Sequence, residues 1–138
     1  MRILSIDHGD KKIGLAICDE SETVARPLKV LIHKSRADDA GAVAEIARAE
    51  GAEKIVIGLP RDDDGAEGHQ ARKVRRWAEA LGEVCQLPID FWDESYSTAE
   101  ASSIQRASGK RRKKSEPDDA IAAAVILQSY LDARVKET

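Results

Sequence analysis

The sequence contains little cysteine and has no long apolar run. Only Cys18 and Cys85 occur among its 138 residues, and their separation fits neither a zinc site nor a disulfide framework. No apolar stretch approaches the roughly 20 residues that a membrane-spanning helix needs. We therefore expect two buried thiols and no membrane segment. Because the N-terminus lacks the pattern of a signal peptide, we also expect a cytoplasmic protein.

Aromatic residues are scarce as well, and no excess of positive charge is present. Aromatic side chains make up 4% of the chain, and the formal net charge is −3. The charge excludes a protein that coats nucleic acid through its overall charge. The few aromatic rings argue against a row of stacking platforms for single-stranded bases. Any nucleic acid would therefore be recognised by its backbone and shape.

Positive charge is instead gathered in three short stretches. They comprise Lys11 and Lys12; Arg72, Lys73, Arg75 and Arg76; and the run Lys110, Arg111, Arg112, Lys113 and Lys114. A single charge run often forms only a solvated surface. Three clusters in a mildly acidic chain indicate a local site for a polyanion. The three histidines, His8, His33 and His69, share no spacing typical of metal ligands, and we predict no role for them.

The hydrophobic pattern predicts one α/β domain over residues 1–138. Strands are expected at residues 2–7, 14–20, 23–33, 54–60 and 87–94. Helices are expected at residues 39–51, 68–84, 97–108 and 117–135. The continuous apolar run in the fourth strand is typical of a parallel sheet that is covered on both faces.

Local signals add detail to this prediction. Asp38 or Asp39 is expected to open the first helix, and Gly51 is expected to end it. Pro27 places the third strand at an edge or irregular position. The apolar stripe of the second helix is expected to comprise Val74, Trp77, Ala78 and Leu81.

Carboxylates interrupt otherwise apolar elements at three places. They are Asp7 in the first strand, the pair Asp93 and Glu94 at the end of the last strand, and the pair Asp118 and Asp119 at the start of the last helix. Ligands of open α/β sheets gather at the carboxyl ends of strands, so these groups could meet there. Each site also has a local explanation, as a turn or a helix start. Together they predict a site for Mg²⁺ or Mn²⁺, because oxygen ligands without Cys or His suit hard cations.

Four stretches of the chain resemble, in order, the signature stretches of the YqgF (RuvX) family. They are IDHGDKKIGLAICD, IGLPRDDDGAEG, DFWDESYSTAEA and DDAIAAAVILQSYL. Members of this family are described as pre-16S rRNA nucleases or as proteins similar to Holliday-junction resolvases. The resemblance implies an RNase H-like mixed five-stranded sheet, with three antiparallel N-terminal strands followed by parallel strands and flanked by helices. It also implies a nuclease that hydrolyses phosphodiester bonds.

The resemblance implies roles for particular residues. Asp7, Glu94 and Asp119 match the three acidic active-site residues of the family, and Asp118 is a further candidate metal ligand. In such a site two divalent ions about 3.5–4 Å apart activate a water and stabilise the leaving oxygen. The predicted nucleic-acid contacts are Lys11, Lys12, Arg61, Arg72, Arg76, Lys110, Arg111, Arg112, Lys113 and Lys114.

One position departs from the family pattern. Ser95 stands where the family commonly has an arginine, so a phosphate contact made by that arginine would have to come from elsewhere. Arg61, directly after the GLP stretch, is a candidate for this contact.

The expected function is 5′-end processing of pre-16S ribosomal RNA. A Holliday-junction-type DNA resolvase and a weakly active or inactive RNA-binding module of ribosome biogenesis are the alternatives. Expected partners are structured RNA or branched DNA and ribosomal precursor particles, bound by a monomer or a homodimer. A sugar kinase or actin-like ATPase is disfavoured, because the chain has room for only one of the two domains that enclose the nucleotide in those proteins.

Overall fold

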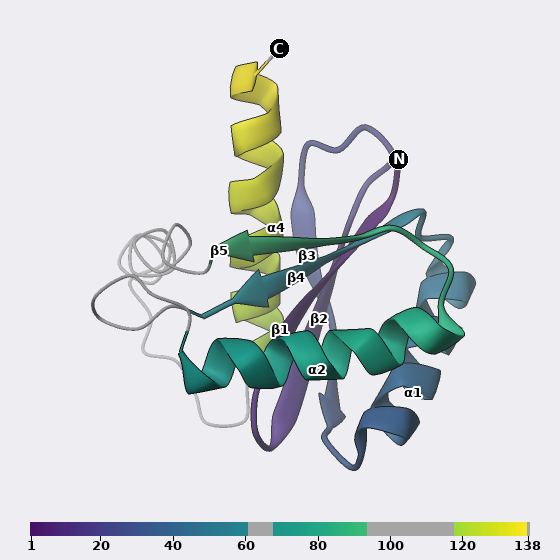
Figure 1. Ribbon diagram of the computed structural model, residues 1–138. Helices are drawn as coiled ribbons and strands as arrows, with labels where there is room; N and C mark the ends of the chain where they lie inside the picture. The colour runs from purple at the N-terminus through teal and green to yellow at the C-terminus, as the bar shows by residue number, and fades with distance from the viewer. Residues whose placement is uncertain (61–67, 94–117, 138) are drawn as a thin grey trace.

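The computed structural model describes residues 1–60, 68–93 and 118–137, and its strands form one mixed sheet. The strands are β1 (Ile3–His8), β2 (Lys12–Cys18), β3 (Ala25–Ile32), β4 (Lys54–Leu59) and β5 (Ile89–Asp93). Their order in the sheet is β3-β2-β1-β4-β5 (Figure 1). β1, β2 and β3 pair antiparallel, whereas β1, β4 and β5 pair parallel. The predicted RNase H-like sheet is therefore confirmed.

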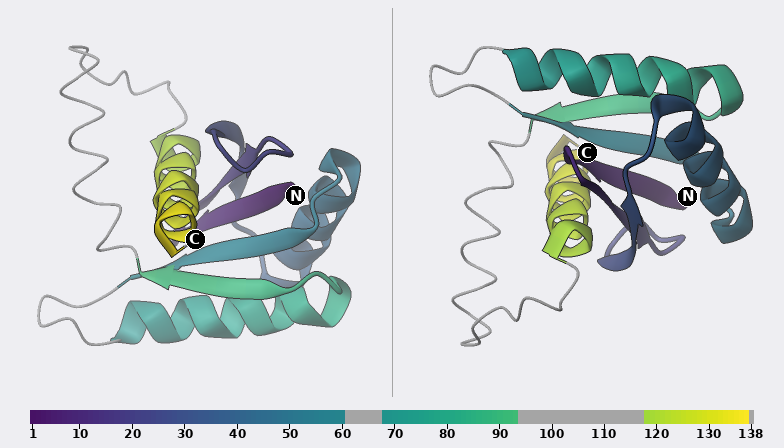
Figure 2. Two further views of the ribbon diagram at one scale, coloured as in Figure 1. Left: turned by 90° about the horizontal axis from the view of Figure 1, so that it is seen from above. Right: turned by 90° about the horizontal axis from the view of Figure 1, so that it is seen from below.

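Helices cover both faces of this sheet. They are α1 (Arg36–Glu50), α2 (His69–Val84) and α4 (Asp118–Glu137). α1 and α2 lie on one face, and α4 crosses the other (Figures 1 and 2). None of the described helices combines the length and apolar character that a membrane crossing requires.

The two-sided cover explains the continuous apolar run in β4. Ile55 and Ile57 pack among residues of α1 and α2, whereas Val56 packs among residues of α4. Alternate side chains of a strand point to opposite faces, so a strand that is covered twice has no polar face. The predicted apolar stripe of α2 is confirmed, because all four of its residues are buried.

The ends of the elements differ in places from their prediction. Ser35 is the N-cap of α1, and its hydroxyl accepts the Asp38 N–H at 3.1 Å. The prediction that Asp38 or Asp39 opens this helix is wrong. Gly51 ends it as predicted, with a φ of 70° that suits glycine. β2 begins at Lys12, earlier than predicted, because Lys12 already pairs with Ile32 of β3 and Ile13 pairs with His8 of β1.

Two further predictions are confirmed. β3 is an edge strand, and its pairing with β2 shifts register next to Pro27. Cys18 and Cys85 are both free and buried. The predicted helix at residues 97–108 lies outside the described residues.

Candidate active site

Asp7 lies near the end of β1, on the face of the sheet that α4 covers. Two residues earlier on the same strand, the buried Ser5 hydroxyl donates a hydrogen bond to the Ala123 carbonyl of α4 at 2.7 Å. Residues two apart on a strand point to the same face, so the Asp7 side chain also points to the α4 side. It is partly buried there.

Gly14 brings the first turn of α4 against the strand next to Asp7. Asp7 and Gly14 are opposite each other in the antiparallel pair of β1 and β2. A Cβ atom added at Gly14 would overlap the carbonyl group of Asp119 and would lie 2.8 Å from the Ala120 nitrogen. The helix backbone therefore occupies the space of a side chain at Gly14. Asp7 and Asp119, distant in the sequence, are carried by adjoining segments of the fold.

Small residues allow this close approach along the whole contact. Ala16, two positions after Gly14 on β2, packs against Ala123 and Ala124 of α4. The small side chains at the start of α4 thus allow this helix to pack directly against the sheet. This packing fixes the position of the Asp119 backbone relative to β1.

The third predicted acidic residue follows the end of β5. The Trp92 indole N–H donates to the Ser129 hydroxyl of α4 at 3.0 Å, so Trp92 points to the α4 face. Asp93 ends the strand and by alternation points to the opposite face. β1, β4 and β5 run parallel, so their carboxyl ends share one edge of the sheet. Glu94 and the side chain of Asp118 lie outside the described residues.

The acidic groups suit a hard divalent cation in their chemistry. Asp7 and Asp119 offer carboxylate oxygens, which Mg²⁺ and Mn²⁺ prefer over nitrogen or sulfur. Within residues 1–60, 68–93 and 118–137 no group of three His, Cys, Asp or Glu side chains is placed to hold a metal.

The predicted nucleic-acid contacts lie in different parts of the molecule. Lys11 and Lys12 are exposed in and just after the turn between β1 and β2, close to Asp7. Arg72 and Arg76 are exposed on α2. Arg61 and residues 110–114 lie outside the described residues.

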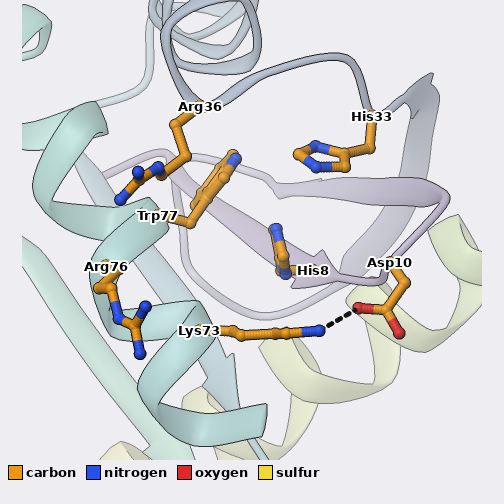
Figure 3. A pocket seen from close by; sticks show the side chains of 7 residues that line it. All are labelled: His8, Asp10, His33, Arg36, Lys73, Arg76 and Trp77. Carbon is orange, nitrogen blue, oxygen red and sulfur yellow. Dashed lines mark hydrogen bonds and ion pairs between the residues drawn. The ribbon is translucent and has the colours of Figure 1, made fainter.

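Arg76 contributes to a hollow on the other side of the molecule, between α2, the start of α1 and the ends of β1 and β3. The hollow has a volume of about 360 Å³ (Figure 3). Its lining residues are His8, Asp10, His33, Arg36, Lys73, Arg76 and Trp77. Because His8 follows Asp7 on β1, the two side chains point to opposite faces of the sheet.

A buried carboxylate supports the wall of this hollow. Asp39 is 3% exposed, and it accepts hydrogen bonds from the Trp77 indole N–H at 3.1 Å and from the Lys34 N–H at 3.0 Å. It also pairs with Nδ1 of His33. Burial alone would raise the pKa of Asp39, but these hydrogen bonds outweigh it and hold the pKa below its ordinary value of 3.8.

Asp39→Asn is expected to lower the free energy of unfolding by about 2 kcal/mol at pH 7, since a charged acceptor of three hydrogen bonds is lost. A carboxyl whose pKa is lower in the folded state stabilises the fold above its unfolded pKa and loses this effect as pH falls. The difference from wild type should therefore shrink below about pH 4. Urea unfolding at several pH values measures it. Asp38→Asn, an exposed neighbour, should change stability by less than about 0.5 kcal/mol. An equal effect of both substitutions would contradict the assignment.

His8 and His33 share no motif, but the fold brings them together. Their ring centroids are 5.6 Å apart, and the His8 ring is 5.1 Å from the Trp77 ring. Burial, and next the neighbouring His33, lower the pKa of His8. Nε2 of His8 is buried and has no hydrogen-bond partner among the described residues. No sequence spacing predicts this group, because it assembles from the ends of two strands and from two helices.

Comparison with known sequences gives matches over nearly the full chain. Residues 1–133 match the family model described as "RuvX: Holliday junction resolvase". Two similar proteins both carry the name "Putative pre-16S rRNA nuclease". The one from Syntrophus aciditrophicus is 46% identical over 138 residues, covering 99% of this chain and 92% of that protein. The one from Caldanaerobacter subterraneus subsp. tengcongensis is 41% identical over 136 residues, covering 97% and 98%.

Solved structures with a similar fold include two resolvases. Thermus thermophilus RuvC in complex with a Holliday junction substrate superposes with a TM-score of 0.68 at 16% identity, covering 99% of this chain and 96% of RuvC. The Fowlpox virus resolvase in complex with Holliday junction DNA gives a TM-score of 0.60 at 13% identity, covering 98% and 99%. At these identities the likeness concerns the fold alone.

Proposed function

The chain belongs to the RuvX family, and on this premise we propose that it is a metal-dependent nuclease that processes the 5′ end of pre-16S ribosomal RNA. The family and the RuvC-like fold support a nuclease that acts on nucleic acid. The names of the full-length relatives favour ribosomal precursor RNA as its substrate. Its partners would be ribosomal precursor particles, and it would act in the cytoplasm.

The contact at Gly14 is the observation that supports this proposal most directly. It sets the segment carrying Asp119 beside the strand that carries Asp7. Two carboxylates on adjoining segments of the fold can share a divalent cation, because carboxylate oxygens are the ligands that Mg²⁺ and Mn²⁺ prefer.

In the proposed site Asp7, Glu94 and Asp119 hold Mg²⁺ or Mn²⁺, with Asp118 as a further candidate ligand. Such ions, when bound, neutralise phosphate charge and make water a stronger nucleophile. Asp7 is the central ligand, because β1 lies in the middle of the sheet. Glu94 directly follows β5, whose end shares the sheet edge with Asp7.

The basic residues beside this edge would position the RNA. Lys11 and Lys12 are the described cations that follow Asp7 most closely in the sequence, and both are exposed. They are placed to contact phosphates that flank the scissile bond. Binding should therefore weaken as salt rises, with a slope set by the number of phosphates contacted.

The substrate is tested by offering precursor RNA and a four-way DNA junction to the protein under identical conditions. We expect cleavage of the RNA at the 16S 5′ end in Mn²⁺ or Mg²⁺, none with EDTA, and slower cleavage of the junction. Faster, symmetric cutting of the junction would favour a resolvase, which needs two active sites in a dimer. Binding of RNA without any cleavage would favour an RNA-binding module of ribosome biogenesis.

Neighbouring aspartates at the start of α4 provide a matched pair of substitutions. Asp119→Asn is expected to reduce metal-dependent cleavage on the order of 10²-fold, because a charged ligand is lost. Asp118→Asn removes the same charge one position away and should have a much smaller effect, because Asp119 keeps the spacing of the family motif. Initial rates at saturating Mn²⁺ measure both. The reverse order of effects would assign the ligand to Asp118.

A further inference from the structure

The hollow between α2, the start of α1 and the ends of β1 and β3 carries an excess of positive charge. Arg36 from α1 and Lys73 and Arg76 from α2 line it (Figure 3). Asp10 is the carboxylate among its lining residues, and it pairs with Lys73 at 3.5 Å. The two arginines are therefore not neutralised by the lining.

Arg36 and Arg76 make no ion pair or hydrogen bond with any residue in the described part of the chain. A guanidinium group offers a planar set of donors that matches the oxygens of a phosphate. Two such groups on separate helices line one hollow and supply hydrogen-bond donors of the kind that an anion accepts.

The hollow is also built to keep its shape. Trp77 is 1% exposed, and its indole is fixed by the hydrogen bond to the buried Asp39. His33 is held by the same carboxylate. A volume of about 360 Å³ lies within the range of small-ligand sites and accommodates a phosphate with part of its sugar.

We propose that this hollow is a second phosphate-binding site, which holds a backbone phosphate of the RNA that the acidic site cleaves. The inference rests on the proposed function. His8 in the hollow and Asp7 in the acidic site are consecutive residues of β1, with Cα atoms about 3.8 Å apart. A nucleic acid that crosses this edge of the sheet can contact both faces. The hollow then fixes the register of the RNA relative to the carboxylates.

The test compares RNA binding by two double variants of equal charge change, both carrying Asp7→Asn to prevent cleavage. Arg36→Ala/Arg76→Ala removes the free cations of the hollow. Arg26→Ala/Arg48→Ala removes two arginines that lie outside the hollow, on β3 and at the last turn of α1. Fluorescence anisotropy over a range of salt concentrations gives the dissociation constant and its salt dependence. Circular dichroism confirms that each variant is folded.

We expect the hollow variant to bind RNA about 10-fold more weakly and to lower the slope of log K against log salt by about 1. The control variant should change the dissociation constant by less than about twofold. Equal weakening by both variants, or no weakening by the hollow variant, would overturn the proposal.

A second measurement separates RNA phosphate from a free anion of the same chemistry. Inorganic phosphate and a nucleoside monophosphate are titrated while the imidazole ¹⁵N signals of His8 and His33 are followed. Signal shifts in the parent that are lost in the hollow variant, together with weakened RNA binding, support the proposal. The same shifts with unchanged RNA binding would assign the hollow to a free phosphorylated molecule and overturn the RNA role.

Cleavage assays with Asp7 intact distinguish failure of this inference from failure of the proposed function. The hollow variant should raise KM more than it lowers kcat. If the wild-type protein cleaves no RNA, the nuclease assignment fails while the binding comparison still decides the role of the hollow. If cleavage is normal and the hollow variant leaves KM unchanged, only the inference about the hollow fails.

Discussion

Asp7→Asn is expected to reduce metal-dependent RNA cleavage on the order of 10³-fold. Asparagine keeps the shape of the side chain and one oxygen, but it loses the negative charge that a divalent cation requires. Asp7 is the central ligand of the proposed site, so its loss should cost more than that of Asp119. Single-turnover rates in Mg²⁺ and Mn²⁺ measure the effect.

Asp132→Asn is the matched control for this substitution. Asp132 is an exposed carboxylate toward the other end of α4, and its replacement should leave cleavage within about twofold of wild type. Thermal unfolding of both variants separates loss of chemistry from loss of fold. A folded Asp7→Asn variant that cleaves at the wild-type rate would remove Asp7 from the active site.

Gly14→Ala is expected to have the largest effect on the fold. The added methyl group would overlap the Asp119 carbonyl group, which belongs to helix backbone and cannot rotate away. α4 must then move off the sheet, at a cost of about 3 kcal/mol in the free energy of unfolding. Because the same movement separates Asp119 from Asp7, cleavage should fall on the order of 10²-fold even in the folded fraction. Urea unfolding and cleavage rates measure the two effects.

Gly41→Ala on α1 makes the same chemical change, but we expect it to raise the free energy of unfolding. A Cβ atom there meets nothing within 4 Å. Alanine has the higher helix propensity, so this variant should be more stable by about 0.5–1 kcal/mol and should cleave normally. If Gly14→Ala behaves like Gly41→Ala, the first turn of α4 does not rest on β2 and the acidic residues are not held together in this way.

Much of the fold could be predicted because it follows from local patterns. The apolar run in β4 indicated a doubly covered strand, and both faces of that strand are buried. Gly51 ended the first helix because glycine, which has no Cβ atom, adopts the positive φ of this position without steric cost. Pro27 indicated an edge strand because proline cannot donate a ladder hydrogen bond.

Other features depend on contacts that no local pattern contains. Ser35 caps α1 in place of Asp38 or Asp39, and the Asp39 carboxylate instead pairs with Trp77 and His33 from other elements. The basic hollow likewise joins His8, His33 and two helices that are far apart in the sequence. Such groups are created by the tertiary fold.

The acidic site could be predicted only in part from the sequence. Asp7 and Asp119 could be named from their motifs, but their proximity depends on how closely α4 approaches the sheet. The sequence signal for that approach was present in Gly14 and Ala16 on one side and in the alanines of α4 on the other. Small residues at matching spacing on a strand and on a helix predict that the helix packs closely against that strand.

The direct test of the metal site is a crystal structure of the protein soaked with Mn²⁺, with the ions located by anomalous scattering. Our account predicts an ion bound by carboxylate oxygens of Asp7, Glu94 and Asp119 at the edge where β1 and β5 end. An ion held by other carboxylates, with Asp7 outside its coordination shell, would contradict it.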